Sequence, residues 1–139
     1  FKKLSKQYPT QIASYIGFDD GLARRIFAGS DFFLMPSRFE PCGLSQQYAL
    51  RYGSIPIARN TGGLSDTISP FKNDGKRANG FLFNLPDSQE LAEVIHRSRE
   101  LYQDKKVFYK IRENALKSSF SWALAAEQYE KTYEWALGK

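Results

Sequence analysis

The sequence predicts an α/β fold, in which short parallel strands alternate with helices. Over residues 1–86 short apolar runs are followed in turn by helical patterns, whereas residues 87–139 are helical throughout. Strands that alternate with helices pair in parallel through crossover helices, which gives a doubly wound sheet. The 139 residues suffice for one domain or part of one. We expect one incomplete domain over 1–139, with an α/β part at 1–86 and a helical part at 87–139.

The first strand–helix unit is expected over residues 11–28. Gln11–Ile16 is the predicted strand, and Gly17 follows it. Asp19 and Asp20 then open a helix that runs to about Ala28. Acidic side chains favour this position because the N-terminus of a helix carries partial positive charge.

The next two strands are expected on either side of a helix. Phe32–Met35 is a continuous apolar run, which suits a strand buried on both faces of a parallel sheet. A loop over 37–43 leads to a helix from Leu44 to about Tyr52, and Ser54–Ala58 is the next short strand. Pro56 lacks a backbone N–H, so it argues against this strand or places it near a sheet edge.

A polar surface loop over Phe71–Asn79 precedes the last predicted strand, Gly80–Phe83. Helices follow, the first of which begins near Asp87. Apolar residues at helical spacing mark the core-facing side of three helices. These residues are Leu91, Val94, Ile95, Leu101 and Tyr102 in the first, Val107, Phe108, Ile111 and Ala115 in the second, and Trp122, Ala125, Ala126, Tyr129, Tyr133 and Leu137 in the third, which Ser121 can cap.

Composition and charge narrow the class of protein. Hydrophobic residues make up 42% and charged residues 25% of the chain, as in globular domains that bury a core. The net charge of +5 is dispersed among acidic residues and forms no basic run with aromatics, so no nucleic-acid partner is expected. No apolar run approaches the roughly 20 residues that cross a bilayer, so no membrane partner is expected either.

The start of the chain and its cysteine content bear on its setting. The chain begins with Phe1 rather than Met, and no apolar stretch follows the basic start, so we expect it to begin inside a longer protein without a signal peptide. Cys42 is the one cysteine, so no internal disulfide is possible. This fits a reducing compartment. The expected location is the cytoplasm, or a plastid if the source is a plant.

The loop after Phe32–Met35 is the first candidate site, because parallel sheets bind ligands beyond the carboxyl ends of their strands. Free N–H groups at Gly43, Leu44 and Ser45, at the start of the next helix, would form an anion site. Glu40 precedes them and could accept hydrogen bonds from a sugar or stabilise positive charge at a sugar carbon. The sequence therefore suggests a phosphorylated sugar ligand.

Two alternatives for Glu40 stay open at this point. It could cap the following helix, or it could pair with Arg38. Either arrangement would give the carboxylate a structural role.

A second loop follows the Ser54–Ala58 strand and contains Gly62 and Gly63. Paired glycines permit positive φ and a close approach of backbone to ligand, although an ordinary tight turn is the alternative. Ser65 or Asp66 could cap the helix after it. Phe18, after the first predicted strand, could stack on a nucleotide base or belong to the core.

The motifs around these loops resemble a known family. Pro36–Leu44 reads PSRFEPCGL, Tyr52–Ile57 reads YGSIPI and Thr61–Thr67 reads TGGLSDT, with Phe120–Trp122 (FSW) before the last helix. In this order and spacing they are similar to bacterial glycogen synthases and plant starch synthases, family 5 of the retaining glycosyltransferases. The likeness covers essentially the whole chain and is densest over residues 30–67.

The resemblance implies the C-terminal, Rossmann-like domain of a GT-B enzyme. Such an enzyme adds glucose from ADP-glucose to the non-reducing end of an α-1,4-glucan with retention of configuration, without a metal or other cofactor. The glucan acceptor would be held mainly by an N-terminal domain, and an upstream Arg and Lys would contact the donor phosphates. The chain alone is therefore expected to be inactive.

The resemblance also assigns roles to residues of this chain. Glu40 matches the active-site glutamate, and Phe18 falls where the family often has a Tyr that stacks on adenine. Two loops match those around the donor glucose and its phosphates, through Cys42, Gly43, Leu44 and Ser45 in the first and Thr61, Gly62 and Gly63 in the second.

One position separates this chain from many other retaining GT-B enzymes. Those enzymes carry a second Glu eight positions after the first, where this chain has Tyr48, as glycogen and starch synthases commonly do. Two alternatives remain: another retaining GT-B glycosyltransferase with a different sugar, and a nucleotide-sugar-binding module without catalysis.

Overall fold

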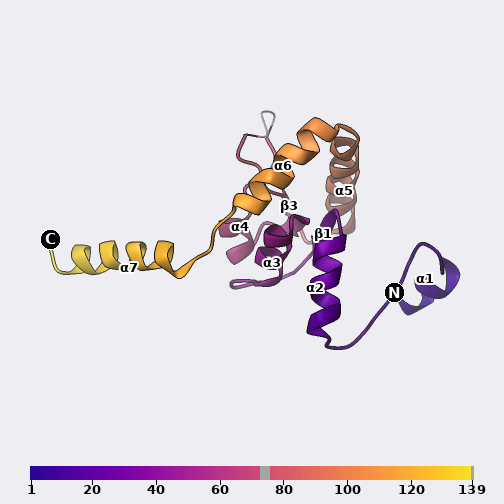
Figure 1. The fold of residues 1–139 in the computed structure, drawn as a ribbon, viewed down its shortest axis with the longest axis horizontal. Coiled ribbons are helices and arrows are strands. Elements are labelled where there is room, and N and C mark those ends of the chain that lie inside the picture. The colour runs from indigo at the N-terminus through magenta and orange to yellow at the C-terminus, as the bar shows by residue number, and fades with distance from the viewer. Residues whose placement is uncertain (73–75, 139) are drawn as a thin grey trace.

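The computed structural model describes residues 1–72 and 76–138, and it is an α/β structure (Figure 1). A parallel sheet lies at its centre, and the prediction of this fold class is confirmed. In chain order the elements are α1 (Lys2–Gln7), α2 (Asp20–Gly29), β1 (Phe32–Met35), α3 (Ser45–Tyr52), β2 (Ile55–Arg59), α4 (Gly63–Thr67), β3 (Phe81–Phe83), α5 (Ser88–Gln103), α6 (Lys105–Lys117) and α7 (Trp122–Ala136).

The sheet has the order β1-β2-β3, and helices pack against both of its faces. Ile55, Ile57 and Phe81 form one core with residues of α5 and α6. Ala58, on the opposite face of β2, packs against Leu64 and against Ile68, which follows α4. Burial of these side chains is the main stabilising term, at about 25 cal/mol per Å² of apolar surface.

The sequence predicts that Phe32–Met35 is a buried strand and that the strand with Pro56 lies near a sheet edge. The structure shows the reverse. β2 is the central strand and is buried over Ile55–Ala58, whereas β1 lies at the edge with Leu34 46% exposed. Pro56 is accommodated because backbone N–H groups alternate in direction along a strand. The N–H of Ile55 points to β1, where it donates to the Asp31 carbonyl at 3.0 Å. The nitrogen of Pro56 therefore faces the β3 side, where pairing begins only at Ile57.

The predicted strand over Gln11–Ile16 is wrong for this structure. These residues run as irregular chain between α1 and α2, with Tyr15 and Ile16 exposed. A strand is stabilised by ladder hydrogen bonds to a neighbour, and the described residues place no strand beside this segment. β1 therefore keeps a free edge.

The starts of α2 and α5 follow the sequence signals closely. The Asp19 carboxylate accepts from the N–H of Leu22 at 2.8 Å and begins α2 as predicted. Asp87 caps α5 through the N–H groups of Gln89 and Glu90, and Asp104 caps α6 in the same way. Aspartate is preferred at this position because it satisfies backbone donors that have no partner within the helix.

The predicted core-facing side of α6 is confirmed, and α6 is also tied to the sheet by polar contacts. Phe108, Ile111 and Ala115 are buried. Arg112 donates through Nε to the Gly53 carbonyl at 3.0 Å, and its guanidinium pairs with Asp31 just before β1. Helix α6 is thus anchored on the α/β part.

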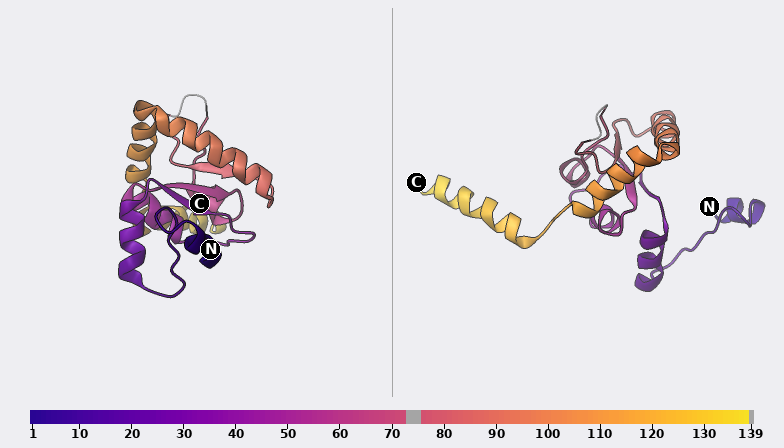
Figure 2. Two further views of the ribbon diagram at one scale, coloured as in Figure 1. Left: turned by 90° about the vertical axis from the view of Figure 1, so that its right-hand side faces the viewer. Right: turned by 45° about the horizontal axis from the view of Figure 1, so that its top comes forward.

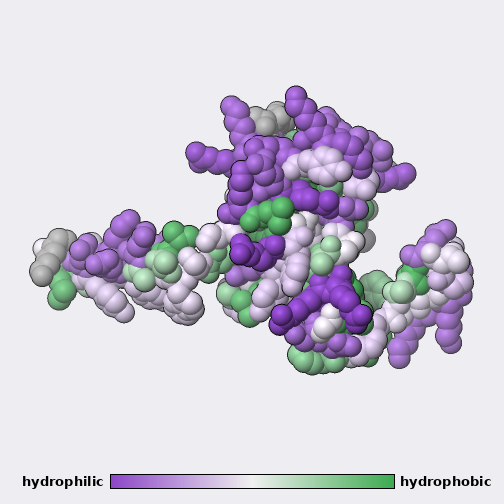
Figure 3. All heavy atoms as spheres, viewed as in Figure 1, coloured by the Kyte–Doolittle hydropathy of each residue, from purple (hydrophilic) through white to green (hydrophobic). Residues whose placement is uncertain are grey.

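The prediction that α7 packs into the core is wrong. No residue of α7 is buried, and Trp122 is 82% exposed. Figures 1 and 2 show α7 extending away from the body of the molecule, and Figure 3 shows apolar side chains at its surface. Ser121 does precede the helix, but its side chain makes no capping hydrogen bond. Helical spacing predicts an apolar side of a helix but not its partner.

The expected polar surface loop over 71–79 is only partly at the surface, and residues 73–75 of it lie outside the described residues. Asn79 is buried. Its Oδ1 accepts from the N–H of Ser69 at 2.7 Å, and its Nδ2 donates to Thr67 and Ser118. These bonds offset the cost of burying the amide.

In the part of the chain that the structure describes, no helix combines the length and the apolar character needed to cross a membrane.

Candidate functional site

The two loops singled out in the sequence lie against each other at the carboxyl edge of the sheet. We define the first loop as residues 36–44, after β1, and the second loop as residues 60–63, after β2. The strands are parallel neighbours, so both loops begin at the same edge. The N–H of Gly63 lies 3.2 Å from the carbonyl oxygens of both Glu40 and Pro41. The structure therefore brings the predicted residues of the two loops together.

Gly62 and Gly63 permit this close contact. A methyl group at Gly62 would lie 2.0 Å from the Glu40 carbonyl oxygen, and one at Gly63 would lie 2.1 Å from the Cys42 carbonyl oxygen. Gly62 also has φ +48°, in the left-handed region. The two glycines thus serve the packing of one loop on the other as well as the turn itself.

Helix α4 begins earlier than the sequence suggested. Its first residue is Gly63 and the preceding Gly62 makes no side-chain cap, so the predicted capping by Ser65 or Asp66 is wrong. The packing of the second loop on the first fixes this start, because the N–H of Gly63 is directed at the first loop.

Glu40 takes neither of the structural roles left open above. Helix α3 has Leu44 at its N-cap position with no side-chain acceptor, and among the described residues Glu40 forms no ion pair with Arg38 and its carboxylate has no hydrogen-bond donor. The residue is half-buried. A half-buried carboxylate without a protein partner beside an uncapped helix start is available to a ligand.

Arg59 holds the start of the first loop, which the sequence did not indicate. It is the last residue of β2, and its Nε donates to the Ser37 carbonyl at 2.8 Å. Its Nη2 donates to the Arg38 carbonyl. The feature that could have identified Arg59 is its position as a cation at the carboxyl end of a buried strand.

Gln46 holds the end of the first loop and was also missed. Its side chain is fully buried, and the two hydrogens of its Nε2 are shared among three acceptors, which are the Cys42 and Gly43 carbonyls at 3.0 and 2.7 Å and Thr67 Oγ1 at 3.2 Å. Its Oε1 accepts no hydrogen bond from the described residues. The feature that could have identified Gln46 is that it is a polar residue on the buried side of α3.

Phe18 does not belong to the core, since it is 96% exposed. It lines a pocket of about 570 Å³ between α2 and α3, whose wall also includes Ser45 and Tyr48. The pocket therefore connects Phe18 with the start of α3. Arg24 and Asp20 in its wall pair at 2.9 Å, and the hydrogen bond to Asp20 raises the pKa of Arg24.

No group of three or more His, Cys, Asp or Glu side chains within residues 1–72 and 76–138 could hold a metal ion. The polar groups of the candidate site are instead the Glu40 carboxylate, the side chains of Cys42, Ser45 and Thr61, and backbone N–H groups. This set suits a ligand with hydroxyl and phosphate groups.

The fold and the paired loops define an α/β domain of the Rossmann-like type, which binds ligands at the carboxyl edge of its sheet. The chain belongs to the glycosyl transferases group 1 family, whose family model matches residues 1–118.

Relatives in this family include glycogen synthases. The chain is 52% identical to the glycogen synthase of Exiguobacterium sibiricum, over 96% of this chain and 28% of that protein. It is 45% identical to the glycogen synthase of Thermosipho melanesiensis, over 100% of this chain and 29% of that protein. The chain thus spans less than a third of the length of these relatives.

A solved structure is also similar. The catalytic domain of starch synthase IV from Arabidopsis thaliana, bound to ADP and acarbose, is 35% identical with a TM-score of 0.84, over 99% of this chain and 29% of that chain. Anabaena HepE in complex with UDP-glucose is 25% identical with a TM-score of 0.67. The predicted resemblance to glycogen and starch synthases, and with it the GT-B fold, is confirmed.

Proposed function

We propose that this chain is part of a glucan synthase that transfers glucose from ADP-glucose to the non-reducing end of an α-1,4-glucan with retention. The observation that carries the proposal is the identity of 42–52% to glycogen synthases over nearly the whole chain. The ADP-bound starch synthase favours adenine as the donor base. The compartment that we propose is the cytoplasm, or a plastid in a plant.

Glu40 is the proposed catalytic residue. The uncapped N-terminus of α3 would hold the diphosphate through its N–H groups, which places the donor glucose toward the carboxylate. As the bond to the leaving phosphate breaks, positive charge grows at the sugar carbon, and a fixed carboxylate favours that state over the ground state. Cys42, Gly43, Leu44 and Ser45 would surround the donor with Thr61, Gly62 and Gly63, and Phe18 would stack on the base.

The donor is tested by steady-state kinetics on the full-length parent protein with glycogen as acceptor. We expect a higher kcat/KM with ADP-glucose than with UDP-glucose. Stacking on Phe18 tolerates any base, so this preference would have to arise from polar contacts around the base. Equal kcat/KM values for the two donors would contradict the proposed substrate.

One alternative has support of its own. The similarity to HepE with UDP-glucose favours another retaining glycosyltransferase with a uridine donor. In that case the same assay would give the higher kcat/KM with UDP-glucose. A binding module without catalysis would give donor binding by calorimetry but no transfer.

A further inference from the structure

A chain of hydrogen bonds ties the two candidate loops together. The N–H of Gly63 is directed at the Glu40 and Pro41 carbonyls of the first loop at 3.2 Å. Thr67 Oγ1 donates to the Gly63 carbonyl at 2.7 Å. The same Oγ1 accepts from Gln46 Nε2 at 3.2 Å. The same Nε2 donates to the Gly43 carbonyl, so the chain closes into a ring on the first loop.

Burial strengthens this ring. The Gln46 side chain is fully buried and Thr67 is half-buried, so water competes little for these bonds. Hydrogen bonds in such surroundings are electrostatically stronger and support one another. A shift of either loop would break at least one of them.

The ring matters for Glu40 because nothing described in the protein holds its carboxylate. Its position follows from its backbone, whose carbonyl oxygen accepts from Gly63. A misplacement of about 1 Å in an active site can lower the rate by about 10²-fold. The contacts that hold the backbone of the first loop therefore determine where the Glu40 carboxylate lies.

We propose that Gln46 and Thr67 are positioning residues that keep the first loop, and with it Glu40, in register with the second loop. Neither needs to touch the substrate. This inference rests on the proposed function, and it adds two side chains to the residues on which that function would depend.

Thr67→Val is the first test, in the full-length parent protein. Valine keeps the volume of threonine but cannot donate to Gly63 or accept from Gln46. We expect kcat with ADP-glucose and glycogen to fall about tenfold or more, with KM for ADP-glucose changed less than threefold, because the loops lose register. Thr67→Ser retains the hydroxyl and should keep kcat within about twofold of the wild type.

Thr132→Val is the matched control. Thr132 Oγ1 donates to the carbonyl four residues earlier in α7, as Thr67 does in α4, but it lies far from the loops on an exposed helix. Because this substitution leaves both loops untouched, we expect the Gly63 amide hydrogen of Thr132→Val to exchange at the wild-type rate. If Thr132→Val and Thr67→Val speed this exchange equally, or if Thr67→Ser is as slow in kcat as Thr67→Val, the inference is wrong.

The ring also predicts coupling. Gln46→Met removes the donor while keeping a side chain of similar length. If Gln46 and Thr67 act through one ring, the double variant should lose little more kcat than Gln46→Met alone. Losses that multiply would show that the two residues act independently, which contradicts the ring.

A readout without turnover separates this inference from the proposed function. The exchange rate of the Gly63 amide hydrogen reports whether that N–H is held against the first loop. We expect about tenfold faster exchange in Thr67→Val than in the wild type or Thr67→Ser. If the wild-type parent transfers no glucose, the proposed function fails. The ring is still supported by faster exchange and refuted by unchanged exchange.

Discussion

Glu40 lies between an edge strand and a helix whose first N–H groups have no side-chain acceptor. A carboxylate beside these donors would be attracted to them, yet no capping contact forms. A side-chain cap from Ser, Thr, Asp or Asn at the N-cap position stabilises a protein by about 1 kcal/mol, and α3, which has Leu44 at that position, lacks this stabilisation. Because the Glu40 carboxylate makes no structural contact with the described residues, we expect Glu40 to be selected for function rather than for structure.

Replacement of Glu40 by Gln in the full-length parent should lower kcat without unfolding the protein. Loss of one preorganised polar contact costs about 10²–10³ in rate, or roughly 3–4 kcal/mol. The free energy of unfolding should change by less than about 1–2 kcal/mol, because the carboxylate has no partner among the described residues. Kinetics and thermal melts on the same variant are the measurement. Near-normal kcat with a large drop in melting temperature would mean that Glu40 is structural.

Gly63→Ala tests the contact between the loops. The added methyl would lie 2.1 Å from the Cys42 carbonyl oxygen and 2.6 Å from Cys42 Cα, so one loop must move. We expect a loss of stability of about 2–3 kcal/mol, at the upper end of overpacking costs, and a lower kcat in the parent enzyme.

Gly29→Ala is the control for this prediction. Gly29 ends α2, and a methyl there would meet nothing within 4 Å. We expect unchanged or slightly raised stability, because alanine restricts the unfolded chain. A thermal melt of each variant is the measurement, and equal effects of the two substitutions would contradict the packing argument.

At the scale of elements, several local signals predicted the structure correctly, whereas the packing partners of the elements were not predicted. Phe32–Met35 was located to the residue, and Asp19 and Asp87 opened their helices, because strand patterns and caps depend on nearby residues. The edge position of β1 and the exposure of α7 depend on which neighbours each element has. A single sequence does not contain that information, so both predictions were wrong.

The same distinction holds for the site. Its loops were predictable because the carboxyl edge of a parallel sheet is a general binding position. Arg59 and Gln46 were not, because their contacts cross between loops separated by about 20 residues of chain. The roles of the predicted residues in binding and catalysis stay predictions.

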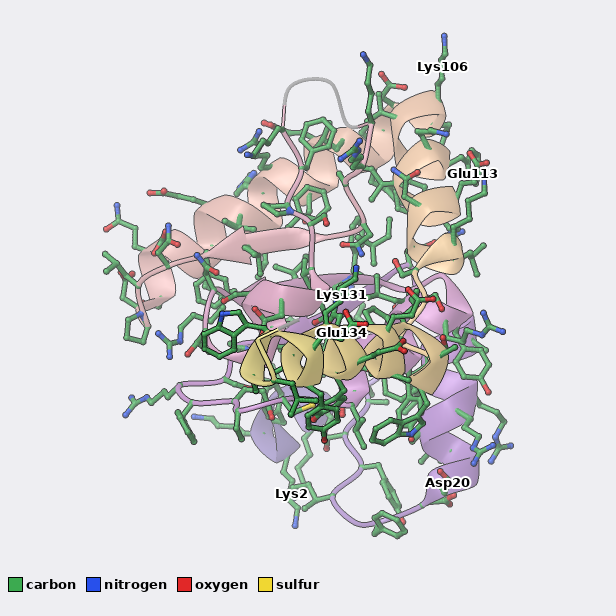
Figure 4. All side chains as sticks on the ribbon, turned by 90° about the vertical axis from the view of Figure 1, so that its left-hand side faces the viewer. Lys2, Asp20, Lys106, Glu113, Lys131 and Glu134 are labelled. Carbon is green, nitrogen blue, oxygen red and sulfur yellow. The ribbon has the colours of Figure 1, made fainter. Side chains whose placement is uncertain are left out.

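The pH dependence of α6 tests an electrostatic contact within one element. Glu113 lies on α6 (Figure 4). It accepts hydrogen bonds from Lys117 and from Lys110, which lower the pKa of Glu113 from 4.5 to about 2. The folded state therefore favours the charged form. The stabilisation is complete above about pH 4.5 and is lost as the pH falls toward 2.

The measurement is an NMR titration of the Glu113 carboxyl in the folded protein, together with melts of Glu113→Gln from pH 2 to 6. The variant should lack this part of the pH dependence. Because the pair is exposed to solvent, added salt should weaken the effect. A titration midpoint that stays near 4.5 would contradict the ion pairs.

At the scale of the whole molecule, α7 stands out. Its aromatic residues are exposed, and the helix extends away from the body of the molecule (Figure 1). Exposed apolar surface of this kind normally marks a contact. The chain also spans less than a third of the glycogen synthases to which it is similar. The exposed side of α7 is therefore where we expect this chain to make a contact.

The last prediction follows from that view: the 139-residue chain by itself does not elongate glucan, whereas its full-length parent does. The candidate site offers the Glu40 carboxylate, the hydroxyls of Ser45 and Thr61 and backbone N–H groups, and the charge that develops on the leaving diphosphate needs cations to stabilise it. In the described residues Arg59 is already engaged with the first loop, and Arg38 is exposed on that loop. The measurement is incorporation of labelled glucose from ADP-glucose into glycogen by each protein at equal concentration.

Circular dichroism of the short chain must first show that it is folded, so that inactivity is not mistaken for unfolding. Glucan elongation by the folded short chain would contradict the proposal that the remaining part of the enzyme supplies acceptor binding and charge stabilisation.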